Sequence, residues 1–112
     1  MTIWRRDMGY EVTLTKYAQQ DFAELDGALK KKAIKALEKL KNGAYGEPLG
    51  NKHGLDLSGY HRLRFNNRRH RAVYVVVEES QLIRVIAIGK RGNEAVYKLA
   101  AIRAQELGPE TQ

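Results

Sequence analysis

The chain has 112 residues, 43% of them hydrophobic, which is enough for one folded domain and argues against disorder. Without cysteine, a signal peptide or an apolar run of roughly 18 residues, it is expected to be a cytoplasmic protein with no disulfide, no cysteine-ligated zinc and no membrane partner. Twenty Lys and Arg residues against 13 Asp and Glu give a net charge of +7 and a pI near 9.8, so the expected partner is a polyanion or an acidic protein.

The first elements are predicted to be a strand and a helix. Residues 9–15 contain several β-branched side chains in weak alternation, which indicates a strand that follows a loose leader over residues 1–8. Next, Ala18, Phe22 and Leu25 recur at helical spacing and form one apolar face.

A second helix is predicted directly after the first. Asp26 can cap its N-terminus, Gly27 separates it from the first helix, and Gly43 ends it. Its apolar stripe consists of Leu29, Ala33, Leu37 and Leu40, widened by Ile34 and Ala36. Two helices joined so closely are expected to form a helical hairpin.

The middle of the chain is predicted to be a loop followed by three strands. Residues 42–59 hold five of the ten glycines and one of the two prolines, which is typical of an irregular loop. The three strand-like runs after it, joined by two tight turns, cover residues 60–65, 70–78 and 82–89. Short adjacent runs of this kind are expected to form an antiparallel meander.

A last helix completes the single domain predicted for residues 1–112. It covers residues 94–107, and residues 108–112 form a frayed tail after it. Its apolar side carries Val96, Leu99, Ala100, Arg103 and Leu107. The predicted fold is α+β: a small antiparallel sheet with the N-terminal helical hairpin packed on one face, and a C-terminal helix. The other face of the sheet is expected to be free for function.

Arginines gather on the predicted sheet. Strand alternation places Arg62 and Arg64 on one face, and Arg71 joins them if the hairpin pairs in register. Arg91 follows the last strand and can join from there. Converging cations repel one another unless an anion completes the site, and a phosphate suits the guanidinium fork. Solvated arginines on an exposed surface are the alternative, which we favour for the two at the hairpin turn.

A second group of cations lies on the second helix, at Lys30, Lys31, Lys32, Lys35, Lys39 and Lys41. A solvated helix face explains any single lysine, but six in twelve residues create a field that could hold RNA or the ribosome through counterion release. The histidines, by contrast, have no metal-ligand spacing, so we expect neither a metal nor a cofactor. His61 is expected to pack against the core.

Several segments together resemble the RelE/ParE family of toxins. They are Tyr60-His-Arg-Leu-Arg-Phe, then Arg71-Ala-Val-Tyr, then Ile88-Gly-Lys-Arg with Tyr97 six residues further on. Each segment is weak alone, but their order and spacing over about residues 9–105 make the resemblance specific. It implies a twisted antiparallel sheet with a helical hairpin on one side, and a cognate antitoxin protein as partner.

The resemblance to RelE-type members further implies a ribosome-dependent endoribonuclease that inhibits translation. Such toxins cut messenger RNA in the A site of the ribosome without a metal, by attack of the 2′-hydroxyl on the adjacent phosphate. The family's catalytic positions correspond here to Arg62, Arg64, Arg71, Arg91 and Tyr97. Tyr97 would stack on a base or orient the 2′-hydroxyl, with packing between helix and sheet as its alternative role.

One departure from the family pattern affects the chemistry. Two strand positions that carry lysines in the best-known pattern, one of them the proposed general base, are Arg62 and Arg64 here. A guanidinium stays protonated at ordinary pH and is a poor base, so the base is not identified. Two alternatives therefore stay open: a ParE-like toxin that inhibits DNA gyrase, and a module that binds RNA or an antitoxin without catalysis.

Overall fold

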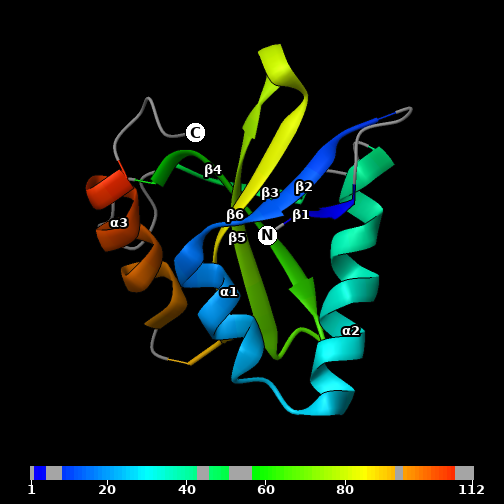
Figure 1. Cartoon of the computed structure of the whole chain (residues 1–112). Coiled ribbons are helices and arrows are strands. Elements are labelled where there is room, and N and C mark those ends of the chain that lie inside the picture. The colour runs from blue at the N-terminus through cyan, green and yellow to red at the C-terminus, as the bar shows by residue number, and fades with distance from the viewer. Residues whose placement is uncertain (1, 5–8, 43–45, 51–56, 93–94, 108–112) are drawn as a thin grey trace.

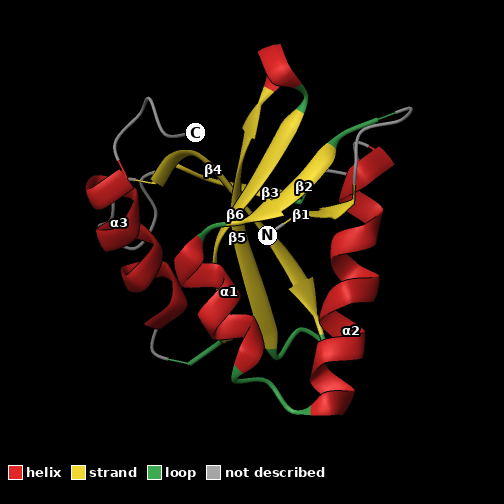
Figure 2. Ribbon diagram, in the orientation of Figure 1, coloured by secondary structure: helices red, strands yellow, loops and turns green. Residues whose placement is uncertain are grey.

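The computed structural model describes residues 2–4, 9–42, 46–50, 57–92 and 95–107, which form a six-stranded sheet and three α-helices (Figures 1 and 2). The strands, in their order across the sheet, are β1 (Thr2–Trp4), β2 (Glu11–Leu14), β6 (Leu82–Lys90), β5 (His70–Val77), β4 (Leu57–Phe65) and β3 (Glu47–Gly50). β2 and β6 run parallel, and every other neighbouring pair is antiparallel. The predicted α+β class and the antiparallel meander of β4, β5 and β6 are confirmed.

The helical hairpin forms as its capping residues predict. Helix α1 (Lys16–Ala23) begins after Thr15, whose hydroxyl accepts a hydrogen bond from the Ala18 N–H at 3.2 Å. Helix α2 (Gly27–Glu38) begins after Asp26, whose carboxylate accepts from the Leu29 N–H at 2.8 Å. The predicted cap is therefore confirmed, and α2 continues into a 3-10 turn, η1 (Lys39–Asn42). The predicted end at Gly43 lies outside the described residues.

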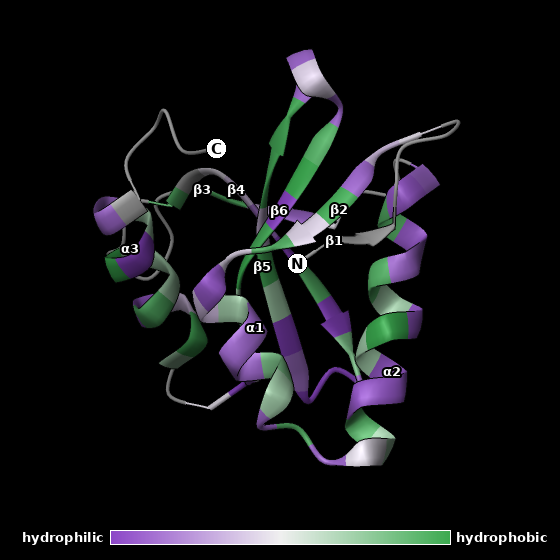
Figure 3. Ribbon diagram, viewed as in Figure 1, coloured by the Kyte–Doolittle hydropathy of each residue, from purple (hydrophilic) through white to green (hydrophobic). Residues whose placement is uncertain are grey.

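The first face of the sheet packs against this hairpin. Its buried core joins the helix residues Ala18, Ala33, Ala36 and Leu37 to the sheet residues Val12, Leu14, Phe65, Ala72, Tyr74, Ile83, Val85 and Ile88. Figure 3 shows these strands as mainly hydrophobic, while hydrophilic residues mark the ends of β4 and β5 that lie near the start of α2. The predicted packing of the hairpin on one face is confirmed.

The second face is not free, contrary to the prediction. Helix α3 (Ala95–Leu107) lies on it and buries Val96, Tyr97 and Ala100 in a second core with residues of β3, β4, β5 and β6. The sequence showed an apolar side on this helix but not which surface would cover it. Leu99, which was predicted on that side, is 42% exposed. The open part of the second face is therefore limited to the side chains beside α3.

Two stretches predicted to be irregular contain strands. β1 lies within the expected leader, where it pairs with β2, and β3 lies within the expected loop, where it pairs with β4. β4 also begins earlier than predicted, at Leu57. Such short segments have no clear period of their own, because pairing with a neighbour supplies their hydrogen bonds. The predicted tail at residues 108–112 lies outside the described residues.

An ion pair joins α1 to α3 across the exposed edge of β6. β2 pairs with β6 only as far as Val85, so the next backbone groups of β6 lack a strand neighbour on that side. Asp21 accepts hydrogen bonds from the Ile88 N–H at 2.9 Å and from Arg103 at 2.6 Å, and Arg103 also donates to the Ile86 carbonyl at 3.0 Å. The pair thus completes the hydrogen bonding of this edge. Among the described residues, no helix is long and apolar enough to span a membrane.

Candidate functional site

The structure brings together the three strand arginines that alternation placed on one face. In the register of β4 and β5, Arg64 lies directly opposite Arg71, and Arg62 lies opposite Val73. Val73 belongs to the core beneath α3, so the three guanidiniums lie on the α3 side of the sheet. This side is the one that α3 leaves partly open, beyond Tyr97.

Tyr97 links two of these arginines from the helix above them. Its hydroxyl accepts hydrogen bonds from Arg62 Nη1 and from Arg71 Nε, each at 3.1 Å. Tyr97 and Arg71 are each only 4% exposed, so both are part of the core that supports the site. Arg71 Nη1 also donates to the carbonyl of Arg68 at 2.6 Å and to the carbonyl of His70 at 3.2 Å. Tyr97 therefore packs between helix and sheet, and in this arrangement its ring is not open to a base.

A carboxylate that the sequence analysis missed already faces the arginines. Glu47 Oε1 and Oε2 accept from Arg62 Nε and Nη2 at 3.2 and 3.3 Å, and Glu47 Oε1 lies 3.0 Å from Arg64 Nε. The hydrogen bond to Glu47 raises the pKa of Arg62 above its ordinary value, with burial opposing it and Tyr97 adding to it. No sequence signal marks Glu47, because the composition around β3 is typical of a loop and the pairing of Glu47 with Arg62 spans 15 residues.

Close packing at Gly46 sets the position of Glu47. A Cβ atom at Gly46 would lie 1.9 Å from the carbonyl oxygen of Arg62, so only glycine allows β3 to approach β4 here. The Gly46 N–H also donates a hydrogen bond to the hydroxyl of Tyr74, which is fully buried. Burial raises the pKa of Tyr74, and this hydrogen bond opposes the rise. The core thus anchors the residue that precedes Glu47.

Arg91 lies beside the turn between β4 and β5, away from the contact of Arg62 with Glu47. Its N–H donates to the carbonyl of Arg69 at 2.9 Å, beside the turn that joins β4 to β5. Asn66, Asn67 and Arg68 in that turn all have left-handed backbone conformations. The side chains of Arg68, Arg69 and Arg91 are exposed. The structure therefore groups Arg91 with the two turn arginines, and Arg71 lies between this group and Arg62.

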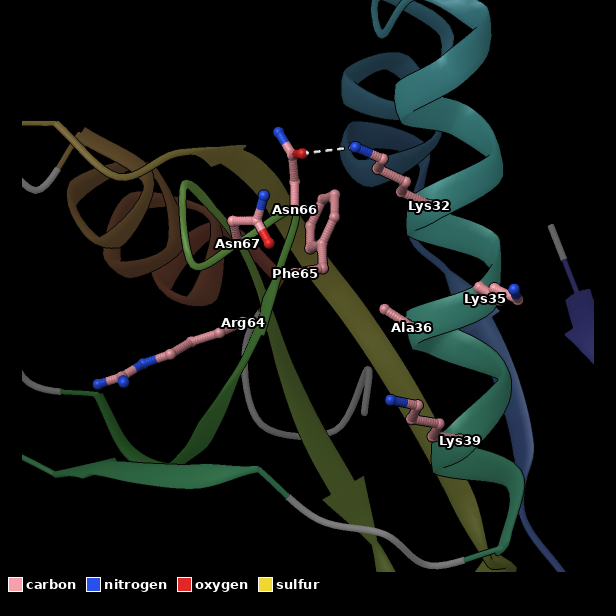
Figure 4. Close-up of a pocket in the computed structure, with 8 residues that line it drawn as sticks. All are labelled: Lys32, Lys35, Ala36, Lys39, Arg64, Phe65, Asn66 and Asn67. Carbon is pink, nitrogen blue, oxygen red and sulfur yellow. Dashed lines mark hydrogen bonds between the residues drawn. The ribbon is translucent and has the colours of Figure 1, made fainter.

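Some of the helix lysines line a groove and others lie outside it. Lys32, Lys35 and Lys39 line a cavity of about 300 Å³ between α2 and the end of β4, where Ala36 and Phe65 supply apolar walls (Figure 4). Lys32 donates to the side-chain oxygen of Asn66 at 3.0 Å, across the groove. Lys30 and Lys31 lie outside it. Arg64 also lines this groove, although Figure 4 shows its side chain directed away from α2.

The two described histidines lie on the hairpin side of the sheet. His61 stacks on Tyr74 with ring centroids 5.5 Å apart, which confirms its predicted packing role. His70 Nδ1 lies 3.0 Å from Asn66 Nδ2, and because Lys32 donates to the amide oxygen, the Asn66 amide is oriented to donate to His70. Burial lowers the pKa of both histidines. Among the described residues, no group of His, Cys, Asp or Glu is arranged to hold a metal ion.

The sequence and the fold have clear relatives. Residues 12–95 match the family described as the ParE toxin of the type II toxin–antitoxin system parDE. The chain belongs to this toxin family. The match runs from β2 to the start of α3 and so contains the arginine cluster. The resemblance to the RelE/ParE superfamily is thereby confirmed, and the protein is a toxin of a type II toxin–antitoxin system.

Relatives from the RelE branch support the same superfamily. An Escherichia coli protein named as RelE-like toxin is 29% identical over 96 residues, which cover 86% of this chain and 98% of that protein. The free E. coli toxin RelE, as an arginine double mutant, has a similar fold, with a TM-score of 0.69 at 21% identity, over 86% of this chain and 98% of the other. The toxin–antitoxin complex RelBE2 of Mycobacterium tuberculosis matches with a TM-score of 0.63 at 20% identity, over 80% and 100% of the two chains.

Proposed function

We propose that this RelE/ParE-family toxin is an endoribonuclease that cuts messenger RNA in the A site of the ribosome and so inhibits translation. The observation that carries the proposal is the cluster of Arg62, Arg64 and Arg71 on the side of the sheet that α3 leaves partly open. The Tyr97 hydroxyl holds two of these arginines through hydrogen bonds to Arg62 and Arg71. The cluster holds guanidiniums at fixed positions on one face of the sheet, where they supply positive charge to an anion that replaces Glu47. Positive charge of this kind stabilises the charge that develops on a phosphate under attack.

Besides the RNA itself, the reaction needs a proton acceptor for the 2′-hydroxyl and a proton donor for the leaving 5′-oxygen. The 2′-oxygen forms a bond to the adjacent phosphorus, the bond from phosphorus to the 5′-oxygen breaks, and a 2′,3′-cyclic phosphate and a 5′-hydroxyl result. The proton of the 2′-hydroxyl leaves to a base, and the departing 5′-oxygen takes up a proton. The ribosome contributes by holding the strand in a geometry that allows in-line attack.

The side chains divide these tasks according to their exposure. Arg62, Arg64 and the exposed Arg91 are the guanidiniums that can reach a phosphate, and we assign them charge stabilisation. Buried Arg71 and Tyr97 keep Arg62 in place, so they act mainly as positioning residues. The lysines of α2 would contact ribosomal RNA, with Lys32, Lys35 and Lys39 acting together at their groove.

A cognate antitoxin is the second partner under this proposal. Several structural relatives are complexes of RelE with the antitoxin RelB, among them one from Pyrococcus horikoshii. The net charge of +7 favours an acidic partner. Leu99 and Ile102 are exposed apolar side chains on α3 that such a partner could cover. Action on ribosomes places the protein in the cytoplasm.

Primer extension on messenger RNA bound to purified ribosomes tests the proposal. Arg91 is exposed and outside both cores, so Arg91→Ala should fold normally and should abolish discrete cuts in the A site. Lys98→Ala makes the same charge change at an exposed position of α3 and should cut like the wild type. Equal cutting by the wild type and Arg91→Ala would remove Arg91 from the site.

Gyrase inhibition is the second candidate function, because the matched family is the ParE toxin. A supercoiling assay with purified DNA gyrase distinguishes the two. Inhibition of gyrase together with no cleavage on ribosomes would replace the nuclease proposal. Ribosome binding with neither activity would indicate a non-catalytic RNA-binding module.

A further inference from the structure

We propose that Glu47 occupies an anion site that a nucleic-acid phosphate takes over: Arg62 and Arg64 form a phosphate-binding fork, and the Glu47 carboxylate is the resident counter-ion that the phosphate displaces. The identity of the phosphate as RNA backbone rests on the proposed function. The anion site itself does not, because it follows from the contacts of these three side chains.

The contacts of Glu47 are those that a phosphate makes with arginine. Its two carboxylate oxygens bind Arg62 side-on, at Nε and Nη2, with distances of 3.2 and 3.3 Å. One of the same oxygens lies 3.0 Å from Arg64 Nε. Arg62 thus binds the carboxylate through hydrogen bonds, and Arg64 adds its charge as an ion pair without hydrogen-bond geometry. A phosphodiester carries a similar pair of charged oxygens and fits the same planar donors.

The pairing of the strands explains why the carboxylate lies there. Glu47 is directly opposite Arg62 in the antiparallel ladder of β3 and β4, so both side chains lie on the same face. Arg64 is two residues further along β4 on that face. Without an anion between them, Arg62 and Arg64 would repel each other. Glu47 therefore allows the cluster to assemble before any nucleic acid arrives.

Of the three side chains, the glutamate is the most exposed to solvent and therefore the one that a phosphate would displace. The side chain of Glu47 is 53% exposed, against 15% for Arg62 and 32% for Arg64. Arg62 is also held from the core side by Tyr97 at 3.1 Å. β3 is a four-residue strand at the end of the sheet order, with β4 as its neighbour. Because water reaches the half-exposed carboxylate of Glu47, its ion pairs are partly screened, and a phosphate that supplies the same charge can replace it.

Competition between Glu47 and an incoming phosphate lowers the affinity of the toxin for a single phosphate. Any phosphate that enters the fork must compete with a carboxylate tethered beside it, which weakens binding to stray nucleic acid. A strand that is also held elsewhere, at the helix lysines or at Arg91, has the higher local concentration needed to displace Glu47. The fork would then select for correctly positioned RNA.

Anion binding by Glu47→Gln and a matched control tests the inference. Glu38→Gln makes the same charge change on α2, where Glu38 is 50% exposed and lies 4.0 Å from Lys41. Inorganic phosphate is titrated at constant ionic strength while the melting temperature is followed. It should bind Glu47→Gln roughly three- to tenfold more tightly than the wild type, because the Glu47 carboxylate no longer competes for Arg62 and Arg64. The Glu38→Gln variant should stay within about twofold of the wild type.

A second measurement uses a 2′-O-methyl RNA oligonucleotide, which can bind but cannot be cut. In the wild type the displaced Glu47 carboxylate takes up a cation, which offsets the cation released from the bound phosphate. Glu47→Gln lacks this offset, so the dependence of log affinity on log salt concentration should steepen by up to about 0.7, the value for one phosphate on a single strand. Equal gains for both variants would show that only net charge matters and would overturn the proposal. So would an unchanged phosphate affinity in Glu47→Gln.

The wild-type protein provides a check that needs no variant. In NMR spectra, titration with inorganic phosphate should shift the Nε–H resonances of Arg62 and Arg64 together with the side-chain carboxyl resonance of Glu47. A carboxyl resonance that stays constant while the arginine resonances shift would contradict displacement. Failure of the nuclease proposal would appear separately, as intact messenger RNA on ribosomes with the anion results unchanged.

Discussion

Replacing Tyr97 by phenylalanine removes a single oxygen from the support of the arginine cluster. The ring stays in the core beneath α3, but Arg71 Nε and Arg62 Nη1 each lose an acceptor at 3.1 Å. Arg71 is 4% exposed, so water cannot easily replace the lost bond. A buried donor left without a partner costs about 1–3 kcal/mol, and a charged one lies towards the upper end. The Tyr97→Phe protein should therefore lose about 2 kcal/mol of its free energy of unfolding.

Urea unfolding followed by circular dichroism measures this loss directly. For a domain of about 100 residues, a loss of 2 kcal/mol also corresponds to a fall in melting temperature of roughly 8 °C. Tyr10→Phe is the matched control, because the Tyr10 hydroxyl donates to Glu78 at 3.0 Å on the surface. Such a surface change should alter stability by less than about 0.5 kcal/mol.

Two results would refute this reasoning. If Tyr97→Phe and Tyr10→Phe unfolded at the same urea concentration as the wild type, the hydroxyl of Tyr97 would not be holding Arg71. If Tyr97→Phe were destabilised as expected but cut messenger RNA at the wild-type rate when folded, the positioning of Arg62 by Tyr97 would have no catalytic consequence.

Two further predictions concern the hairpin side and the edge of β6. Asp21→Ala strips Arg103 and the Ile88 N–H of a largely buried acceptor, and loss of one partner of such a pair costs about 3–5 kcal/mol. Urea unfolding measures this, and a loss below about 1 kcal/mol would contradict it. Burial lowers the pKa of His70 and of His61, so the unfolded chain binds protons more readily than the folded protein. Their contribution to stability is present above about pH 6.5, the pKa in the unfolded chain, and is lost as the pH falls from there through the lower pKa of the folded protein. The urea midpoint should therefore fall from about pH 7.5 to about 5.5, and a constant midpoint would disprove the effect.

Local features of the sequence predicted much of the arrangement around the arginines. The alternation of β4 and β5 placed Arg62, Arg64 and Arg71 on one face, and the register of the hairpin confirms that they meet. Asp26 caps α2 as its position before an apolar stripe indicated. Both inferences depend on residues that are neighbours along the chain, or that are joined by one short turn. Such relations leave a visible pattern in the sequence.

The anion that balances the arginines could not be predicted in the same way. The converging arginines indicated an external phosphate, whereas in the structure Glu47 lies against Arg62 and Arg64. β3 has a glycine and a proline and no alternation, so its composition resembles that of a loop. It is a strand because β4 offers it a ladder, and because Gly46 allows the close approach.

By itself, the sequence determined the order of the main elements, the faces of the two central strands and the membership of the RelE/ParE superfamily. Tertiary structure alone decided that α3 covers the second face, that Tyr97 is buried between helix and sheet, and that Glu47 meets Arg62. The physical reason is the range of the interactions. Periodicity and capping act within a turn or two of chain, whereas strand pairing and helix docking join distant segments, and many partners satisfy the same local pattern equally well.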